Sequence, residues 1–171
     1  MERAVRHKNR SKNSLRLLSV ITLISAFSQV TLGGYVRSSE SGLGCPDWPL
    51  CHGQIIPPFE FHTLVEYSHR LNASLLMVLV VTLFFLCLTK FKLEKLTIRL
   101  SGVALALVLS AAVLGGITVL TELAWWIRLI HLSLAELLIG SITAMVWLAF
   151  YNNRSSSVNT MGITTPHWRK K

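Results

Sequence analysis

Two histidines, His69 and His131, follow glycine pairs in two copies of one short pattern, and imidazole is a common metal ligand in proteins. In chain order, the copies are TLGGYV (31–36) with EYSHRLNASLL (66–76), and VLGGIT (113–118) with RLIHLSLAELL (128–138). Neutral imidazole is a good ligand for haem iron, and two imidazoles from opposite helices give six-coordinate iron. The doubled pattern therefore predicts that both histidines lie at one depth and hold a flat metal cofactor.

Charged residues accompany both histidines at helical spacing. Glu66, His69 and Arg70 stand at positions i, i+3 and i+4 and share one helix face, and Arg128 precedes His131 by three residues. Ionisable groups cost about 2.5–3.5 kcal/mol each at the centre of a membrane, which favours placement toward protein or a polar site. Arginines suit the propionates of a haem through charged hydrogen bonds. The alternative is an interfacial cluster in which Glu66 pairs with Arg70 and reaches water.

The glycine pairs, Gly33–Gly34 and Gly115–Gly116, allow the backbone to approach either a macrocycle or another helix closely. A zinc site is disfavoured because the apolar segments offer too few further nitrogen or sulfur ligands. Both considerations favour a planar cofactor over a bare ion, while tight helix packing remains open for the glycines.

Glu136 lies in the second copy, five residues past His131. That spacing turns it about 140° away from the histidine around the helix. We therefore expect Glu136 to serve a helix interface or a neighbouring chain.

Four apolar runs dominate a chain of 171 residues that is 51% hydrophobic and only 15% charged. They cover residues 15–36, 64–89, 100–120 and 126–150. About 20 helical residues at about 1.5 Å each cross the roughly 30 Å hydrocarbon core. The first run exceeds the roughly 7–15 apolar residues of a signal peptide, so it too is expected to be a helix. We predict an all-α integral membrane protein with a four-helix transmembrane bundle.

Lysine and arginine gather at one end of these spans. Of the 17 in the chain, six precede or open the first span, four lie between the second and third, and four follow the fourth. Such an excess marks the cytoplasmic side, so both termini are expected there. The net charge of +9 then reflects topology and lipid contact, with no nucleic-acid partner. The predicted organisation is a basic cytoplasmic leader (1–14), a transmembrane domain (15–150) and a cytoplasmic tail (151–171).

The two copies also predict two similar helical hairpins. Their glycine pairs are 82 residues apart (34 to 116) and their histidines 62 apart (69 to 131), so they differ by 20 residues in the first outer loop, 37–63. Repeats that run in the same direction imply a pseudo-twofold axis along the membrane normal. His69 and His131 would face one another across that axis.

The 37–63 loop contains Cys45 and Cys51 on the side of the membrane where disulfides persist. The five residues between them can close a disulfide. Such a bridge either stiffens the loop or forms a redox-active pair above the cofactor. The loop also holds four of the five prolines, which argue against regular structure. Cys87, near the cytoplasmic end of the second span, is expected to be an apolar filler.

The stretch GGYVRSSESGLGCPDWPLCHGQIIPP, followed by EYSHR, resembles the haem A synthase family. LGGITVL and IHLSLAE fit the same family, and the similarity runs from Leu32 to Leu138. Members of this family oxidise a ring methyl of haem O to a formyl group, giving haem A for terminal oxidases. Most have eight helices in two four-helix halves, each with a histidine pair. One half holds a haem b cofactor and the other receives the substrate haem.

The chain looks like the first of those halves. The resemblance implies axial haem ligation by His69 and His131, a catalytic role for Glu66, and an outer-loop pair formed by Cys45 and Cys51. Together with the arginines beside the histidines, it implies a cell-membrane protein with haem b as cofactor and haem O as substrate. The site would lie near the extracytoplasmic side.

A single half has one evident haem position. A homodimer would restore eight helices and two sites; a separate half-size subunit or a chain without activity are the alternatives. Haem O, haem A, the lipid bilayer and a haem O synthase are the expected partners. A non-catalytic haem carrier or oxidase assembly factor is the alternative function. A membrane thiol oxidoreductase fits less well because the chain lacks a second cysteine pair to relay through.

Overall fold

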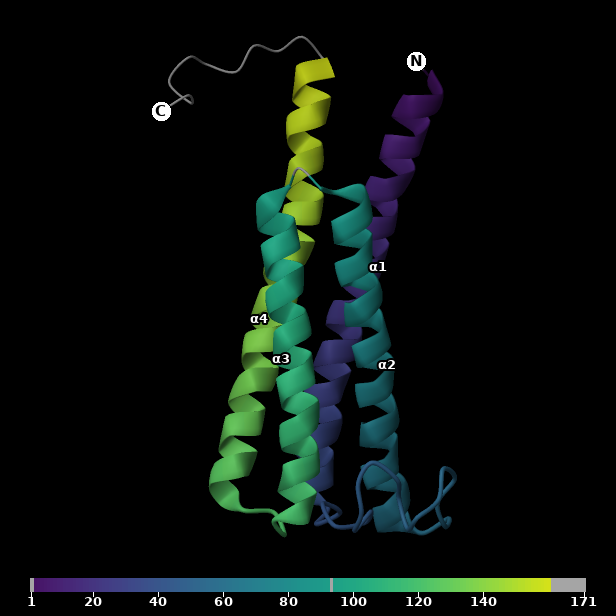
Figure 1. The fold of residues 1–171 in the computed structure, drawn as a ribbon, viewed down its shortest axis with the longest axis vertical. Coiled ribbons are helices and arrows are strands. Elements are labelled where there is room, and N and C mark those ends of the chain that lie inside the picture. Colours follow the sequence, from purple (N-terminus) through teal and green to yellow (C-terminus); the bar gives the residue numbers. More distant parts are fainter. Residues whose placement is uncertain (1, 93, 161–171) are drawn as a thin grey trace.

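The computed structural model describes residues 2–92 and 94–160, with side chains described for 10–92 and 94–151. The last part of the predicted tail, residues 161–171, lies outside the described residues. Regular structure in the described part consists of four helices, α1 (Glu2–Ser38), α2 (Phe61–Lys90), α3 (Lys95–Leu120) and α4 (Trp125–Thr160) (Figure 1). The predicted all-α fold is therefore confirmed.

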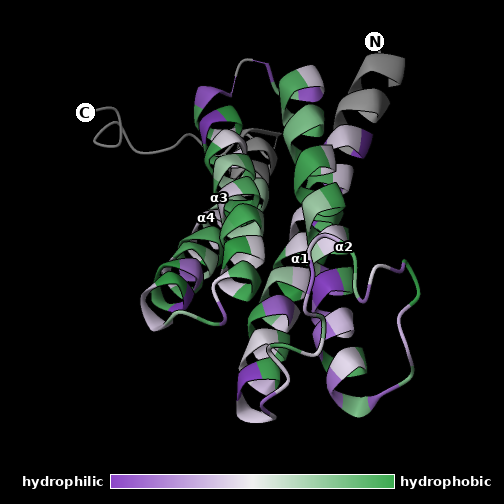
Figure 2. Ribbon diagram, turned by 60° about the horizontal axis from the view of Figure 1, so that its bottom comes forward, coloured by the Kyte–Doolittle hydropathy of each residue, from purple (hydrophilic) through white to green (hydrophobic). Residues whose placement is uncertain are grey.

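Each helix contains a segment that is long and apolar enough to cross a membrane, which confirms the four predicted spans. Figure 2 shows hydrophobic residues along most of the helix lengths and hydrophilic residues largely toward their ends. Helices α1 and α4 extend beyond the predicted spans, to Glu2 and Thr160. No glycine or proline occurs in residues 2–14 or 151–160, so nothing in these sequences stops the helix.

The helices form a bundle in which each packs against two neighbours: α1 on α2, α2 on α3, α3 on α4, and α4 back on α1. Short connections join α2 to α3 and α3 to α4, whereas residues 39–60 form the long α1–α2 loop. This loop and the α3–α4 connection lie at one end of the bundle, called here the loop end (Figure 1). The first turns of α1 and the last turns of α4 lie at the opposite end, the terminal end.

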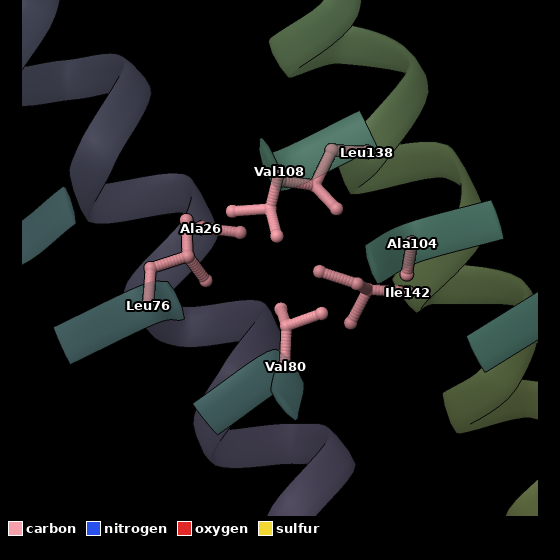
Figure 3. Packing of buried hydrophobic residues seen from close by; sticks show 7 residues of the cluster. All are labelled: Ala26, Leu76, Val80, Ala104, Val108, Leu138 and Ile142. Carbon is pink, nitrogen blue, oxygen red and sulfur yellow. The ribbon is translucent and has the colours of Figure 1, made fainter. Parts of the chain in front are cut away.

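The middle of the bundle is a packed apolar cluster with side chains from all four helices. They are Ala26, Leu76, Val80, Ala104, Val108, Leu138 and Ile142, and Figure 3 shows them pointing toward one another. Lipid tails are as apolar as these side chains, so close van der Waals packing holds the helices together. A second cluster near the terminal end includes Cys87, which is fully buried beside Leu83 and Met145. These clusters hold the two hairpins together in the middle of the bundle and toward the terminal end.

Candidate functional site

Each hairpin places a histidine against a glycine of its partner helix. In the first hairpin, a Cβ built on Gly33 of α1 would lie 3.1 Å from Cε1 of His69 on α2. In the second, a Cβ built on Gly115 of α3 would lie 3.4 Å from Cε1 of His131 on α4. The sequence repeat is therefore also a repeat of contacts, in which the first glycine of each pair makes room for an imidazole edge.

The second glycines of the two pairs differ from one another. A Cβ on Gly116 would lie 2.7 Å from Cδ2 of Trp48, so the indole ring of the long loop lies directly on α3. A Cβ on Gly34 would have nothing within 4 Å. Close backbone packing between helices, the alternative left open for these glycines, is not what the described contacts show. A side-chain ring occupies the space beside Gly33, Gly115 and Gly116, whereas the space beside Gly34 is open.

Behind His69 lies a chain of polar side chains in the α1–α2 hairpin. The side-chain amide of Gln29 donates toward the His69 ring, with its nitrogen 3.2 Å from each ring nitrogen. Asn72 in turn donates to the Gln29 carbonyl oxygen at 2.8 Å and to the Ser25 backbone carbonyl at 3.1 Å. These residues hold the His69 ring in place from the α1 side. Gln29 and Asn72 are not predicted from the sequence, although Gln29 stands one turn before Gly33 and Asn72 one turn after His69.

In the second hairpin, His131 and Arg128 lack such support. Nδ1 of His131 and Nε of Arg128 are buried and have no hydrogen-bond partner among the described residues. Most buried side-chain nitrogen atoms in proteins do have a partner, and an unpaired one costs about 1–3 kcal/mol. Because two such atoms lie one helical turn apart on α4, this part of the bundle is suited to a polar or metal-containing ligand.

Arg70 ties α2 to the long loop. Its guanidinium donates to the backbone carbonyls of Asp47 (2.6 Å), Leu50 (2.7 Å) and Cys45 (2.9 Å). Its Nε donates to the carboxylate of Glu66 at 3.1 Å, an ion pair within one turn of α2. The predicted face of Glu66, His69 and Arg70 therefore exists. Its arginine contacts the loop and Glu66, so Arg128 is the arginine with an unpaired donor in the described site.

The loop segment held by Arg70 is closed by a disulfide between Cys45 and Cys51, whose Cα atoms are 4.7 Å apart. Within it, the Asp47 carboxylate accepts hydrogen bonds from the backbone N–H groups of His52 (2.6 Å) and Gly53 (2.8 Å). The N–H of Gly53 is the main reason that the pKa of Asp47 lies below its ordinary value. The disulfide predicted from the cysteine spacing is present, and the loop it closes is ordered by side chains on both of its sides.

Two further contacts attach the loop to the start of α2. The Thr63 hydroxyl donates to the Gly44 carbonyl at 3.0 Å, and the Tyr67 hydroxyl donates to the Ile55 carbonyl at 2.7 Å. Together with Trp48 on α3, these contacts place the loop across both hairpins at the loop end. The loop that contains the disulfide therefore contacts both hairpins at the end of the bundle where His69 and His131 lie.

No group of three or more His, Cys, Asp and Glu side chains among the described residues could hold a bare metal ion. Two histidines from different hairpins suit a metal whose other ligands belong to a bound macrocycle. Glu136 lies on an exposed face of α4, away from this site.

The chain is similar to the members of a known protein family. Residues 16–166 match the family described as cytochrome oxidase assembly protein. The chain belongs to that family. It is 32% identical over 151 residues to the heme A synthase of Bacillus pumilus, covering 85% of this chain and 48% of that protein. The family and the four spans make it a multi-pass membrane protein.

Other relatives cover the chain in the same way. The heme A synthase of Exiguobacterium sibiricum is 32% identical over 141 residues, covering 76% of this chain and 47% of that protein. That of Staphylococcus saprophyticus is 28% identical over 159 residues, covering 91% and 52%. The chain thus spans about half the length of the curated relatives it matches. The predicted resemblance to haem A synthases is confirmed.

Arg70 offers a test of how the loop is held. Arg70→Met keeps an unbranched stem but removes the donors to three loop carbonyls. Charged hydrogen bonds contribute about 1.5–3 kcal/mol each, so we expect the Cys45–Cys51 disulfide to be reduced about tenfold faster or more. The measurement is the rate of reduction by a water-soluble phosphine. Arg37→Met, at an exposed arginine of α1, should leave the rate unchanged, and equal rates for both variants would contradict this role of Arg70.

Proposed function

We propose that this chain is a haem-binding oxidoreductase of the haem A synthase type, which oxidises the ring methyl of haem O to a formyl group. The observation that carries the proposal is the doubled Gly–His contact, with buried and unpaired nitrogen atoms of Arg128 and His131 beside it. The names of the relatives support the choice of reaction. A methyl-to-formyl conversion removes electrons and protons and adds one oxygen atom, so the site must handle both charge and protons.

The residues of the site fit a haem. His69 and His131 come from different hairpins, are backed by glycines, and would ligate the iron. Arg128 has a buried donor that would pair with a propionate, whereas Arg70 is engaged by the loop. When bound, haem b supplies one-electron redox chemistry at its iron, and the protein supplies orientation and electrostatics. The chain positions the ring by two imidazoles and one arginine.

Glu66 is the residue that we propose for the proton chemistry. Its side chain is buried, lies one turn from His69 and is held by Arg70 Nε at 3.1 Å. In this position a carboxylate can accept a proton released when the methyl is oxidised, or stabilise positive charge that develops at the ring. The ion pair with Arg70 orients the carboxylate and links it to the loop that covers the site.

We further propose that two copies of the chain act together, which gives eight spans and two haem positions, one for a cofactor and one for the substrate. The lysine and arginine distribution supports an orientation with the terminal end in the cytoplasm and the loop end outside the cell membrane. The Cys45–Cys51 disulfide is compatible with that location. A haem O synthase would supply the substrate from the same membrane.

The experiment is to express the full chain together with a haem O source and to separate the extracted pigments by chromatography. We expect haem A to appear, with a haem that copurifies with the protein. Haem O that stays unconverted while haem copurifies would instead identify a haem carrier or assembly factor. A protein that binds no haem at all would contradict the proposal as a whole.

A further inference from the structure

Helix α4 carries an exposed carboxyl group at mid-membrane depth. Glu136 lies 11 residues from Trp125 and 11 from Trp147, which is about 16 Å of helix in each direction. Both tryptophans are exposed, as expected of side chains at the two interfaces of a membrane. Among the described residues, Glu136 is the one exposed acidic or basic side chain more than ten residues from both ends of its span.

The position is costly if lipid is the neighbour. A charged side chain at the centre of a bilayer costs about 2.5–3.5 kcal/mol or more on insertion scales. Within the described residues, the Glu136 carboxyl has no hydrogen bond or ion pair that would offset this cost. Burial inside the bundle does not explain Glu136 either, because its side chain is exposed. A neighbour outside the bundle must therefore supply its polar partners.

The residues around Glu136 form a regular line. Exposed residues of α4 recur at alternating spacings of three and four, and we call this line the α4 stripe. Its members are Trp126, Leu129, Ser133, Glu136, Gly140, Thr143, Trp147 and Phe150. An alternating three-and-four spacing is that of a helix packed on a parallel or antiparallel partner helix at a small crossing angle. The stripe is thus one continuous helix-packing face.

The composition of the stripe is the reverse of a lipid-facing surface. Its large apolar and aromatic members lie toward the ends, whereas Ser133, Glu136, Gly140 and Thr143 occupy the middle. At about 100° per residue, these four lie on average about 160° from His131, so the stripe faces away from the haem site. Small residues and hydroxyls are typical of contacts between transmembrane helices. A Cβ on Gly140 would have nothing within 4 Å, so the glycine leaves room outside the bundle rather than inside it.

We infer that the α4 stripe is the surface through which two copies of this chain associate in the membrane. The inference deepens the proposed function, because it assigns the interface of the homodimer proposed there. A second copy related by a twofold axis along the membrane normal presents the same stripe at the same depth. The carboxyl of Glu136 then faces that of the other copy, and the Ser133 hydroxyl of the other copy lies within one helical turn of it, about 4.5 Å in depth. Ser133 and Gly140 have small side chains or none, so they leave room for the two carboxyls where the helices approach.

The first test is cross-linking of the full chain in lipid nanodiscs, with Cys87→Ser as background. Gly140→Cys should form a disulfide-linked dimer under mild oxidation. Val78→Cys, which lies at a similar depth on the exposed face of α2, is the matched control. We expect at least about tenfold more cross-linked dimer from Gly140→Cys, since a specific contact of about 1–2 kcal/mol separates the two faces. Equal yields from the two positions would overturn the inference.

The second test measures dimer dissociation by single-molecule photobleaching over a range of protein-to-lipid ratios. Glu136→Leu should weaken the dimer about tenfold or more, while Glu136→Gln, which keeps hydrogen-bonding groups, should stay within about threefold of the parent. Gly140→Leu should also dissociate the dimer without disturbing the bundle, because the position is open. Thr82→Leu, at an exposed hydroxyl of α2, is the control and should change nothing. A parent chain that is monomeric, or that pairs through α4 with a different protein, would contradict a second copy as the partner.

These outcomes separate the interface from the proposed function. Helix content by circular dichroism and copurifying haem report whether each variant keeps its bundle and its site. Loss of the dimer with haem retained supports the α4 stripe. An intact α4-dependent dimer that binds no haem would leave the interface standing and contradict the function.

Discussion

Replacing His131 with glycine is expected to reduce the haem bound per protein by more than about 100-fold. Loss of a residue that merely supports a metal ligand costs about 10–100-fold, and loss of the ligand itself costs more. The buried Nδ1 of His131 has no hydrogen-bond partner in the described structure, so its removal leaves no group paired with that atom exposed. His69→Gly should have the same effect, although it also releases Gln29. The measurement is the haem-to-protein ratio of the purified variants.

Free imidazole distinguishes a ligand from a structural residue. In both glycine variants, added imidazole can enter the space of the missing ring and should restore much of the haem. His52→Ala is the matched control, because His52 lies in the loop and contacts the Gly44 carbonyl rather than the site. Its haem content should equal that of the parent chain. An unchanged haem-to-protein ratio in His131→Gly would contradict haem ligation by His131.

Glu66→Gln is expected to lower conversion of haem O by about 10²-fold or more while bound haem stays near the parent level. General acid–base groups contribute about 10²–10⁴-fold to reaction rates, and glutamine keeps the shape of the side chain without its proton-accepting charge. Haem A formed per bound haem, in cells that produce haem O, is the measured quantity. Glu60→Gln, at an exposed glutamate just before α2, should convert haem O normally.

Arg70→Met separates two ways in which Glu66 could act. If Glu66 served only to hold the loop through Arg70, both variants would lose conversion to the same extent. We expect a smaller loss in Arg70→Met, because the carboxylate beside His69 remains. Equal losses would assign Glu66 to loop positioning and contradict its proposed proton chemistry.

Much of the fold and part of the candidate site could be predicted from the hydropathy of the sequence and from its doubled motif. Apolar runs of sufficient length allow few structures other than transmembrane helices, so the four spans could be predicted without tertiary information. The Gly–His repeat predicted two similar hairpins, and the structure adds that Gly33 contacts His69 and Gly115 contacts His131. The spans and the repeated motif depend only on the length of the apolar runs and on the spacing of residues along them, and both can be read from the sequence.

The contacts between helices and the long loop could not be predicted from the sequence. Arg70 shares a helix face with His69, yet its guanidinium reaches the loop, because backbone carbonyls at Cys45, Asp47 and Leu50 converge on it only after the loop folds. The packing of Trp48 on Gly116 depends on the path of the same loop. Helices α1 and α4 were also predicted too short: α1 begins at Glu2 and α4 ends at Thr160, since polar residues outside the membrane continue a helix when no glycine or proline interrupts them.

The most direct test of the paired-histidine site is electron paramagnetic resonance of the ferric haem in the purified protein, measured for the parent chain and for His69→Gly and His131→Gly. The account predicts low-spin iron with two imidazole ligands in the parent, and conversion of the residual haem to a high-spin form in each variant. A parent spectrum that is high-spin, or a low-spin spectrum that survives either substitution, would contradict it.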